Sequence, residues 1–172
     1  NQYTNGAIRD AVKDIVGVQF RNTATIGGSI FGRYGFSDVL TVFLAMDSYV
    51  VCHKAGMIPL AIYANQKADR DIIVKIVVKK VPLKMAYLAH RHAKTDFPML
   101  TCAVSYMDGA WRAAVGARPS KAELMIDDEN RTAEAFGAHV AEHLAFDTNM
   151  RGSAEYRRQI TPVLVRRAIE MA

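Results

Sequence analysis

The chain has 172 residues, the length of one domain or of two small domains that pack together. Its hydrophobic fraction of 51% and charged fraction of 23% are typical of a folded globular protein, and they exclude a disordered, collagen-like or low-complexity chain. The formal net charge of +5 permits anionic partners, but no nucleic-acid-binding motif accompanies it. We therefore predict no nucleic-acid partner.

The cysteine count also limits the class of protein. Cys52 and Cys102, the two cysteines, exclude a four-cysteine zinc site and a disulfide scaffold. Each lies in an apolar, strand-like run, which predicts buried free thiols in a reducing cytoplasm. No apolar stretch reaches the roughly 18–20 residues of a membrane helix, and no signal peptide is visible. We expect a cytoplasmic chain without a membrane partner.

The first half of the chain begins with helical spacing. Apolar residues from Gly6 to Gly17 recur at a helical period, with Gly17 as the expected C-cap. The segment Arg21–Gly35 is rich in Gly, Thr and Ser, has no regular period, and is too apolar to be a linker. Ser37 or Asp38 is then expected to cap a short buried helix over residues 39–46.

Strand signals follow this helix. Tyr49–His53 and Met57–Leu60 flank Lys54-Ala55-Gly56, a pattern typical of a β-hairpin with glycine in its turn. The β-branched run Asp71–Val78 predicts a central strand. We place a domain boundary near Val81–Pro82, where the texture of the sequence changes.

The second half predicts three strands and two helices. The strands are Lys84–His92, Leu100–Met107 and Trp111–Ala117, with a hairpin turn at Asp108-Gly109. The helices are Thr132–Leu144 and Ser153–Met171, and Pro162 should kink or interrupt the second helix. The predicted fold is therefore α/β (α+β in layout). Residues 1–81 form one part, and residues 82–172 form a small antiparallel sheet packed by two helices.

The glycine-rich segment Thr25–Gly35 is the first candidate site. Glycines let backbone N–H groups approach a phosphate closely, and the hydroxyls of Thr23, Thr25 and Ser29 are suitable donors. The segment lacks both the GxGxxG pattern and the GK[ST] of a P-loop. A phosphate-binding loop and a tight loop that packs between helices both remain open.

Three polar groups are weaker candidates. His139 and His143 share a helix face, as metal ligands often do, but no third ligand lies near them in the sequence. His90 and His92 share a strand face close to Asp96, which suits either acid–base chemistry or a solvated edge. The arginine pairs of the last helix favour a solvated face or a subunit contact; they are Arg157-Arg158 and Arg166-Arg167.

Several motifs in order resemble a known family. The residues from Val18 to Ile30, with Asn22-Thr23-Ala24-Thr25-Ile26-Gly27-Gly28 at their centre, precede Ser37-Asp38-Val39-Leu40. Later come Asp96–Val104 and Arg151-Gly152-Ser153-Ala154-Glu155-Tyr156-Arg157-Arg158. Together they resemble the flavin-binding subunit of the molybdenum hydroxylases, the family of xanthine dehydrogenase and carbon monoxide dehydrogenase. In that family residues 1–81 would be the second subdomain of the flavin domain, and residues 82–172 its C-terminal domain.

The resemblance implies an FAD site and no catalytic side chain. Asp38 matches an acidic residue that contacts the flavin nucleotide, and a second FAD pyrophosphate loop matches Thr25, Ile26, Gly27, Gly28 and Ser29. The family passes electrons from iron–sulfur clusters on a partner subunit, through FAD, to NAD or another acceptor. Its molybdenum cofactor lies on a third subunit. The implied partners are therefore a molybdenum-binding subunit and an iron–sulfur subunit.

Two departures from the family pattern change the expectation. Ser29 stands where the family usually has Asn, and the family's earlier glycine loop has no counterpart in the 24 residues before Thr25. We therefore expect a chain that lacks the first subdomain, binds FAD weakly or not at all, and self-associates through uncovered apolar surface. The alternative is a truncated, non-catalytic subunit that serves as an interaction module without flavin.

Overall fold

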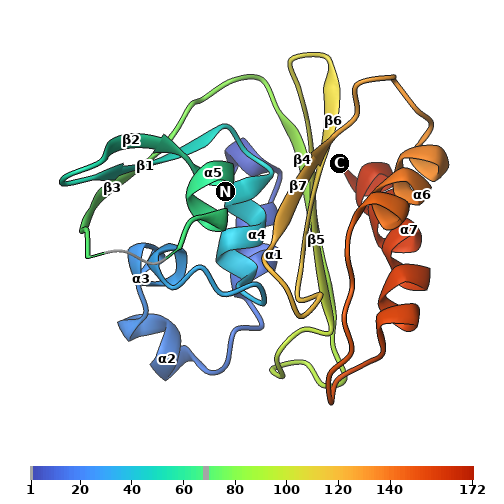
Figure 1. Ribbon diagram of the computed structural model, residues 1–172, viewed down its shortest axis with the longest axis horizontal. Helices are drawn as coiled ribbons and strands as arrows, with labels where there is room; N and C mark the ends of the chain where they lie inside the picture. The colour runs from blue at the N-terminus through green and yellow to red at the C-terminus, as the bar shows by residue number, and fades with distance from the viewer. Residues whose placement is uncertain (1, 68–69) are drawn as a thin grey trace.

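The computed structural model describes residues 2–67 and 70–172. Its elements form layers (Figure 1): a three-stranded sheet, a layer of short helices, a four-stranded sheet and a pair of long helices. The predicted fold class, α/β with an antiparallel sheet and two C-terminal helices, is confirmed. Among the residues that the structure describes, no helix combines the length and apolar character that a bilayer crossing needs.

The N-terminal half contains more helices than the sequence pattern predicts. They are η1 (Gln2–Thr4), α1 (Ala7–Val12), α2 (Val18–Thr23), α3 (Ile26–Phe31), α4 (Asp38–Leu44) and α5 (Leu60–Asn65). The first predicted helix ends early, and Gly17 lies at the N-cap of α2 instead of forming a C-cap. The segment predicted to be irregular contains α3, whose two glycines hide the helical period.

The three-stranded sheet has the order β2-β1-β3, formed by β1 (Ser48–Cys52), β2 (Gly56–Pro59) and β3 (Ile73–Val78). The predicted hairpin is confirmed, with Cys52 opposite Gly56 across its turn. The prediction that the β-branched run is a central strand is wrong, because β3 lies at the edge. Its Val74 is 60% exposed, so β-branching here reflects strand preference without burial on both faces.

The second sheet is antiparallel in the order β4-β5-β6-β7, with β4 (Lys84–His90), β5 (Leu100–Met107), β6 (Ala110–Gly116) and β7 (Glu123–Ile126). Three strands were predicted, and β7 is the fourth. The turn at Asp108-Gly109 is confirmed, since both residues have positive φ. The two predicted helices are α6 (Ala133–His143) and α7 (Ala154–Met171), and α7 continues through Pro162 without interruption.

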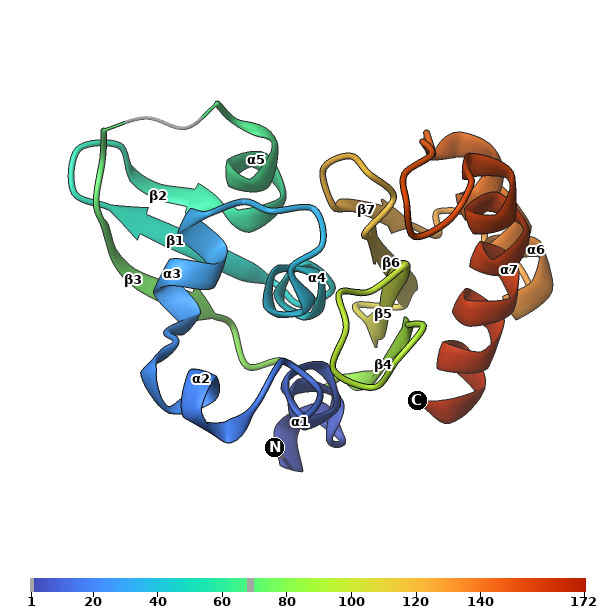
Figure 2. The ribbon, with the colours of Figure 1, turned by 90° about the horizontal axis from the view of Figure 1, so that it is seen from below.

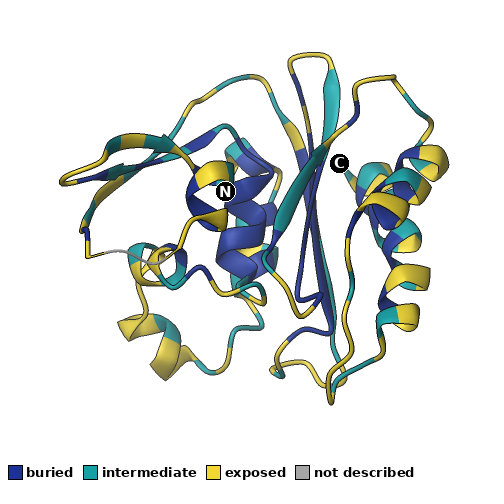
Figure 3. Ribbon diagram, viewed as in Figure 1, coloured by how far each residue is buried: buried dark blue, intermediate teal, exposed yellow. Residues whose placement is uncertain are grey.

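The four-stranded sheet is covered on both faces, which places the core on either side of it. In β5 the side chains alternate: Leu100, Cys102 and Val104 face α6 and α7, whereas Ala103 packs with α4. Thr101 lies on the α4 side too, where its hydroxyl meets that of Thr41 at 3.0 Å. Every residue of α4 is buried, as Figure 3 shows by its dark blue ribbon.

The predicted boundary near Val81–Pro82 lies between β3 and β4. Helices α1 and α4, from the first part, pack against β4 and β5 of the second. The two parts therefore share one core, in which Leu40 and Val50 from the first part cluster with Tyr87 from the second. Both cysteines are buried free thiols, as predicted.

Candidate functional site

The N-terminal end of α4 lies beside a cavity of about 480 Å³, which we name the α3 pocket. Residues from the end of α1 to α3, the loop before α4 and the loop between β4 and β5 line it. Figure 2 shows these segments around the end of α4. The pocket thus joins parts of the chain that are up to 84 residues apart, from Asp14 to Pro98.

A side-chain cap stabilises the first turn of α3. Thr25 has an extended backbone, and its Oγ1 accepts a hydrogen bond from the Gly28 N–H at 3.0 Å. The N–H groups of Ile26 and Gly27 belong to the first turn, which has no intrahelical acceptors for them. A Cβ built on Gly27 would meet nothing within 4 Å, so space lies in front of this turn.

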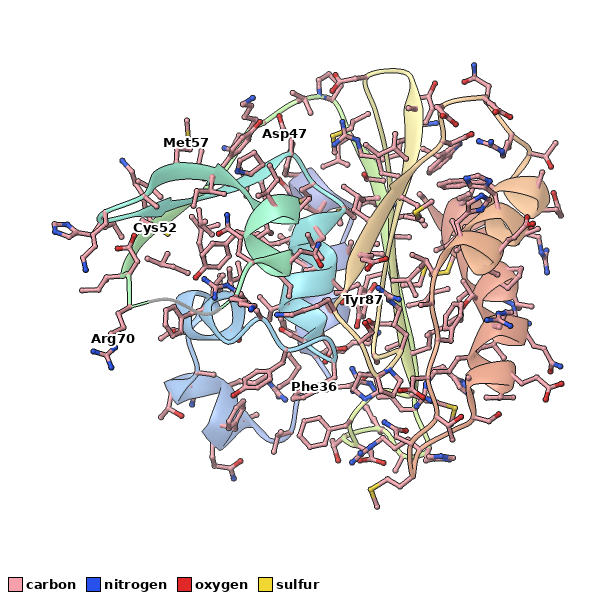
Figure 4. All side chains as sticks on the ribbon, in the orientation of Figure 1. Phe36, Asp47, Cys52, Met57, Arg70 and Tyr87 are labelled. Carbon is pink, nitrogen blue, oxygen red and sulfur yellow. The ribbon has the colours of Figure 1, made fainter. Side chains whose placement is uncertain are left out.

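A buried carboxylate lies at the other side of the pocket. Asp38 is 6% exposed, and its Oδ1 accepts hydrogen bonds from the Tyr87 hydroxyl and the Arg91 guanidinium. Figure 4 shows Tyr87 on β4, next to α4. Burial raises the pKa of Asp38, whereas the hydrogen bonds from Tyr87 and the charge of Arg91 lower it. Burial dominates, and the carboxyl pKa lies above its usual value.

Aromatic rings form the outer wall of the pocket. Phe36 and Phe97 meet edge to face, with ring centroids 4.9 Å apart, and Tyr34 stacks on Phe36 at 5.2 Å. The three rings are 41–60% exposed, and Figure 4 shows Phe36 on the loop that precedes α4. Phe20 on α2, 50% exposed, also lines the cavity. The wall is therefore suited to the face of a large flat ligand.

The structure brings four of the predicted residues into this one cavity: Thr25, Gly28, Ser29 and Asp38. Ile26 and Gly27 belong to the same turn but are not among the residues that line the pocket. The assignment of these six residues to a flavin remains a prediction. Hydroxyls, backbone N–H groups and a carboxylate at one cavity are nevertheless the donors and acceptor that a dinucleotide needs.

Arg91 is a site residue that the sequence reasoning missed. Arg91 lies between His90 and His92 in the sequence. Its guanidinium is nearly buried, and it donates to the Asp38 carboxylate and, at 2.6 Å, to the Asp96 carbonyl. The histidines themselves contact the C-terminal region. The Nε2 of His90 lies 3.0 Å from the Tyr156 hydroxyl, and that of His92 lies 2.9 Å from the Arg151 carbonyl. The sequence offers one signal for Arg91: a carboxylate buried at the start of a helix, as Asp38 is predicted to be, needs a cationic partner.

The other candidates lie elsewhere. The rings of His139 and His143 lie on α6 with centroids 4.0 Å apart, and the described residues contain no group of three His, Cys, Asp or Glu side chains that could hold a metal. The prediction of a solvated face or subunit contact is wrong for Arg157, which is 0% exposed. Its guanidinium donates to the carbonyl of Met99, directly before β5, at 2.9 Å and to that of Asp147, in the loop before α7, at 2.7 Å.

A family model and several known proteins are similar to this chain. Residues 2–83 match the family model described as the FAD binding domain in molybdopterin dehydrogenase. A curated relative, the uncharacterized protein YgfM of Escherichia coli K12, is 29% identical over 167 residues. The match covers 95% of this chain, which spans 64% of the length of that relative.

Solved structures share the fold. Carbon monoxide dehydrogenase from Hydrogenophaga pseudoflava, in a form that lacks the Mo-pyranopterin moiety of the molybdenum cofactor, superposes with a TM-score of 0.83 at 20% identity. That match covers 99% of this chain and 68% of the other. Quinoline 2-oxidoreductase from Pseudomonas putida 86 gives a TM-score of 0.77 at 18% identity, covering 94% and 64%.

The fold is therefore one that this chain shares with carbon monoxide dehydrogenase and quinoline 2-oxidoreductase. Within this fold, residues 2–83 match the FAD binding domain family of the molybdopterin dehydrogenases. The resemblance to the flavin-binding subunit of the molybdenum hydroxylases is confirmed.

Proposed function

We propose that this chain forms the FAD-binding part of a molybdenum-containing hydroxylase or dehydrogenase. In this proposal it takes electrons from iron–sulfur clusters on a partner subunit and passes them through FAD to NAD or another acceptor, as in the xanthine dehydrogenase type. A molybdenum-binding subunit is the other partner. One observation carries the proposal: the capped start of α3 and the buried Asp38 meet in a single cavity with an aromatic wall.

The residues at the start of α3 fit a diphosphate. The Thr25 cap fixes the turn beside the cavity. The N–H groups of Ile26 and Gly27 belong to this first turn, which has no intrahelical acceptors for them, and they lie next to the residues that line the cavity. Ser29 adds a hydroxyl at the cavity surface. These donors, with the positive end of the short helix, favour the negative charge of phosphate oxygens.

The remaining lining fits the rest of the cofactor. Phe36 and Phe97 offer ring faces and edges to a flat ring system, and they exclude water from it. Arg91 and Tyr87 both donate to the Oδ1 of Asp38, so the carboxylate is fixed at the edge of the cavity. FAD supplies the redox chemistry when it is bound, and the protein supplies its position and surroundings.

A second candidate function is an interaction module that carries no flavin. It is favoured by the exposed apolar side chains around the same cavity, among them Val16 at 51% and Tyr34 at 60% exposure. Surfaces of this kind commonly receive a protein partner. The two functions differ in whether FAD binds to the chain.

Titration of FAD with the purified chain tests the proposal, with quenching of flavin fluorescence as the signal. We expect weak but saturable binding with one FAD per chain. Competition by ADP, which carries the diphosphate without the flavin, should displace part of the bound FAD. Absence of saturable binding at millimolar FAD would contradict the proposal and leave the interaction module.

A further inference from the structure

A second cavity, of about 680 Å³, lies beyond the aromatic wall of the α3 pocket. We name it the Tyr34 pocket. The loop over residues 32–36, the loop over residues 117–121 and the segment before α7 line it. Tyr34, Phe36, Phe97 and Pro98 line both cavities, so these side chains form the partition between them.

The Tyr34 pocket is cationic. Lys121 and Arg151 line it, and no carboxylate does among the described residues. The half-buried Lys121 side chain has no hydrogen bond or ion pair within the described part of the chain. Arg151 is partly neutralised by Asp96, whose Oδ1 lies 3.6 Å away, but its buried Nε has no hydrogen-bond partner there. Arg33 also lines the pocket, but its guanidinium lies over the ring of Tyr63, 3.8 Å from the centroid.

Hydrogen bonds to Asn149 fix the cationic side of the pocket. The fully buried Arg157 donates to the Asn149 Oδ1 at 2.6 Å, and the backbone N–H of Arg151 donates to the same oxygen at 3.0 Å. The Arg151 guanidinium then lies over the ring of Phe97, 5.1 Å from its centroid. The cation and the aromatic partition are therefore fixed to one another.

The two loops pack backbone to backbone. The Ala117 N–H donates to the Gly35 carbonyl at 2.6 Å, and a Cβ on Gly35 would come within 1.8 Å of the Ser120 carbonyl oxygen. Arg33 and Ala117 also have positive φ, at 49° and 58°, which is costly for residues with a Cβ. Strained backbone of this kind gathers at ligand sites.

We propose that the Tyr34 pocket binds a nucleoside phosphate, independently of the α3 pocket. The exposed face of Tyr34 receives the flat base, and Lys121 and Arg151 receive the phosphate. Asn149 and Ser120 add polar groups on the same side. The site combines an aromatic face with two cations, which neither an apolar ligand nor a cationic one would match.

Titration with AMP tests the site, followed by NMR chemical shifts or calorimetry on the whole chain. We expect one saturable AMP, with adenosine and inorganic phosphate each binding more weakly than AMP. Lys121→Gln should weaken AMP about tenfold, the effect of losing one charge-assisted hydrogen bond. The control Lys84→Gln removes the same charge from an exposed lysine outside the pocket and should leave AMP binding unchanged.

FAD distinguishes the two cavities. In the proposed arrangement Lys121→Gln leaves FAD binding as it is in the unmodified chain, and saturating FAD does not abolish AMP binding. Three results would overturn the inference: no saturable AMP binding, equal loss in the two lysine variants, or AMP binding that FAD displaces and Lys121→Gln does not affect. The last result would place AMP in the α3 pocket, and it would leave the proposed flavin site standing.

Discussion

The guanidinium of Arg91 donates to the carboxylate of Asp38, and this contact joins the end of β4 to the first turn of α4. Both side chains are less than 10% exposed, at 9% and 7%. The Tyr87 hydroxyl shares the same carboxylate oxygen. The ion pair therefore links the two halves of the chain at the floor of the α3 pocket, where it serves stability and site geometry together.

We predict that Asp38→Ala lowers the free energy of unfolding by about 3 kcal/mol, because it leaves Arg91 buried without its anion. Tyr87→Phe should cost about 1 kcal/mol, since it removes one hydrogen bond. The control is Asp47→Ala. The Lys79 Nζ lies 3.3 Å from the Asp47 Oδ2, and the Lys79 side chain is 56% exposed, so losing this ion pair should cost under about 1 kcal/mol. Urea unfolding measures all three. Equal losses for Asp38→Ala and Asp47→Ala would contradict the role of the buried pair.

Gly28→Asp should weaken FAD binding at least about tenfold. The new carboxylate would lie at the pocket surface, where it repels phosphate oxygens, and its Cβ would meet the Thr25 Oγ1 at 3.1 Å and disturb the cap. Ala138→Asp, on the exposed side of α6, adds the same charge far from the pocket along the chain and serves as the control. Fluorescence titration gives both affinities, and circular dichroism shows that each variant is folded. Unchanged FAD affinity in folded Gly28→Asp would remove α3 from the site.

Much of this architecture could be predicted from local patterns, and the exceptions have physical causes. Helices α6 and α7 and the hairpin at Gly56 carry their caps and periods in the sequence, so they were found. The sequence pattern does not predict α3, because its glycines interrupt the apolar period of the helix. It does not predict β7 either, because a strand of four residues is too short to show an alternating pattern. The contact of Arg91 with Asp38 spans 53 residues, and only the tertiary fold reveals it.

The hairpin turn between β1 and β2 should weaken in acid. Burial of Asp71 raises the pKa of its carboxyl, but hydrogen bonds from the backbone N–H groups of Lys54, Ala55 and Ile72 lower it by more. The pKa of Asp71 therefore lies below the usual 3.8. A lowered folded pKa means that the stabilisation is present above 3.8 and is lost as pH falls through the folded pKa. Asp71→Asn should therefore melt at a lower temperature than the parent at pH 7. The difference in melting temperature should shrink as the pH falls below 3.8. A difference that does not change between pH 7 and pH 2 would contradict this role.

The two thiols should be unreactive in the folded chain. Burial raises the pKa of Cys102 to about 12, so almost no thiolate exists at pH 8, and Cys52 is only 5% exposed. An aromatic disulfide reagent should label neither residue under native conditions and both in guanidinium chloride. Rapid labelling of the native chain would show that one of these strands opens far more readily than its burial implies.

The apolar side chains around the α3 pocket should cause the chain to self-associate. Phe20 and Tyr34 line the pocket, Ile26 begins α3 beside it, and each of the three is at least 50% exposed. Removing such surface from water is favourable at about 25 cal/mol per Å², which suffices for a weak dimer when several rings take part. Sedimentation over a concentration series should show association that the double change Phe20→Ser and Tyr34→Ser reduces. Met150→Ser, at a residue 92% exposed in the loop before α7, should have no effect. A chain that stays monomeric at high concentration, or a loss of association in Met150→Ser alone, would show that this face does not bind a second copy.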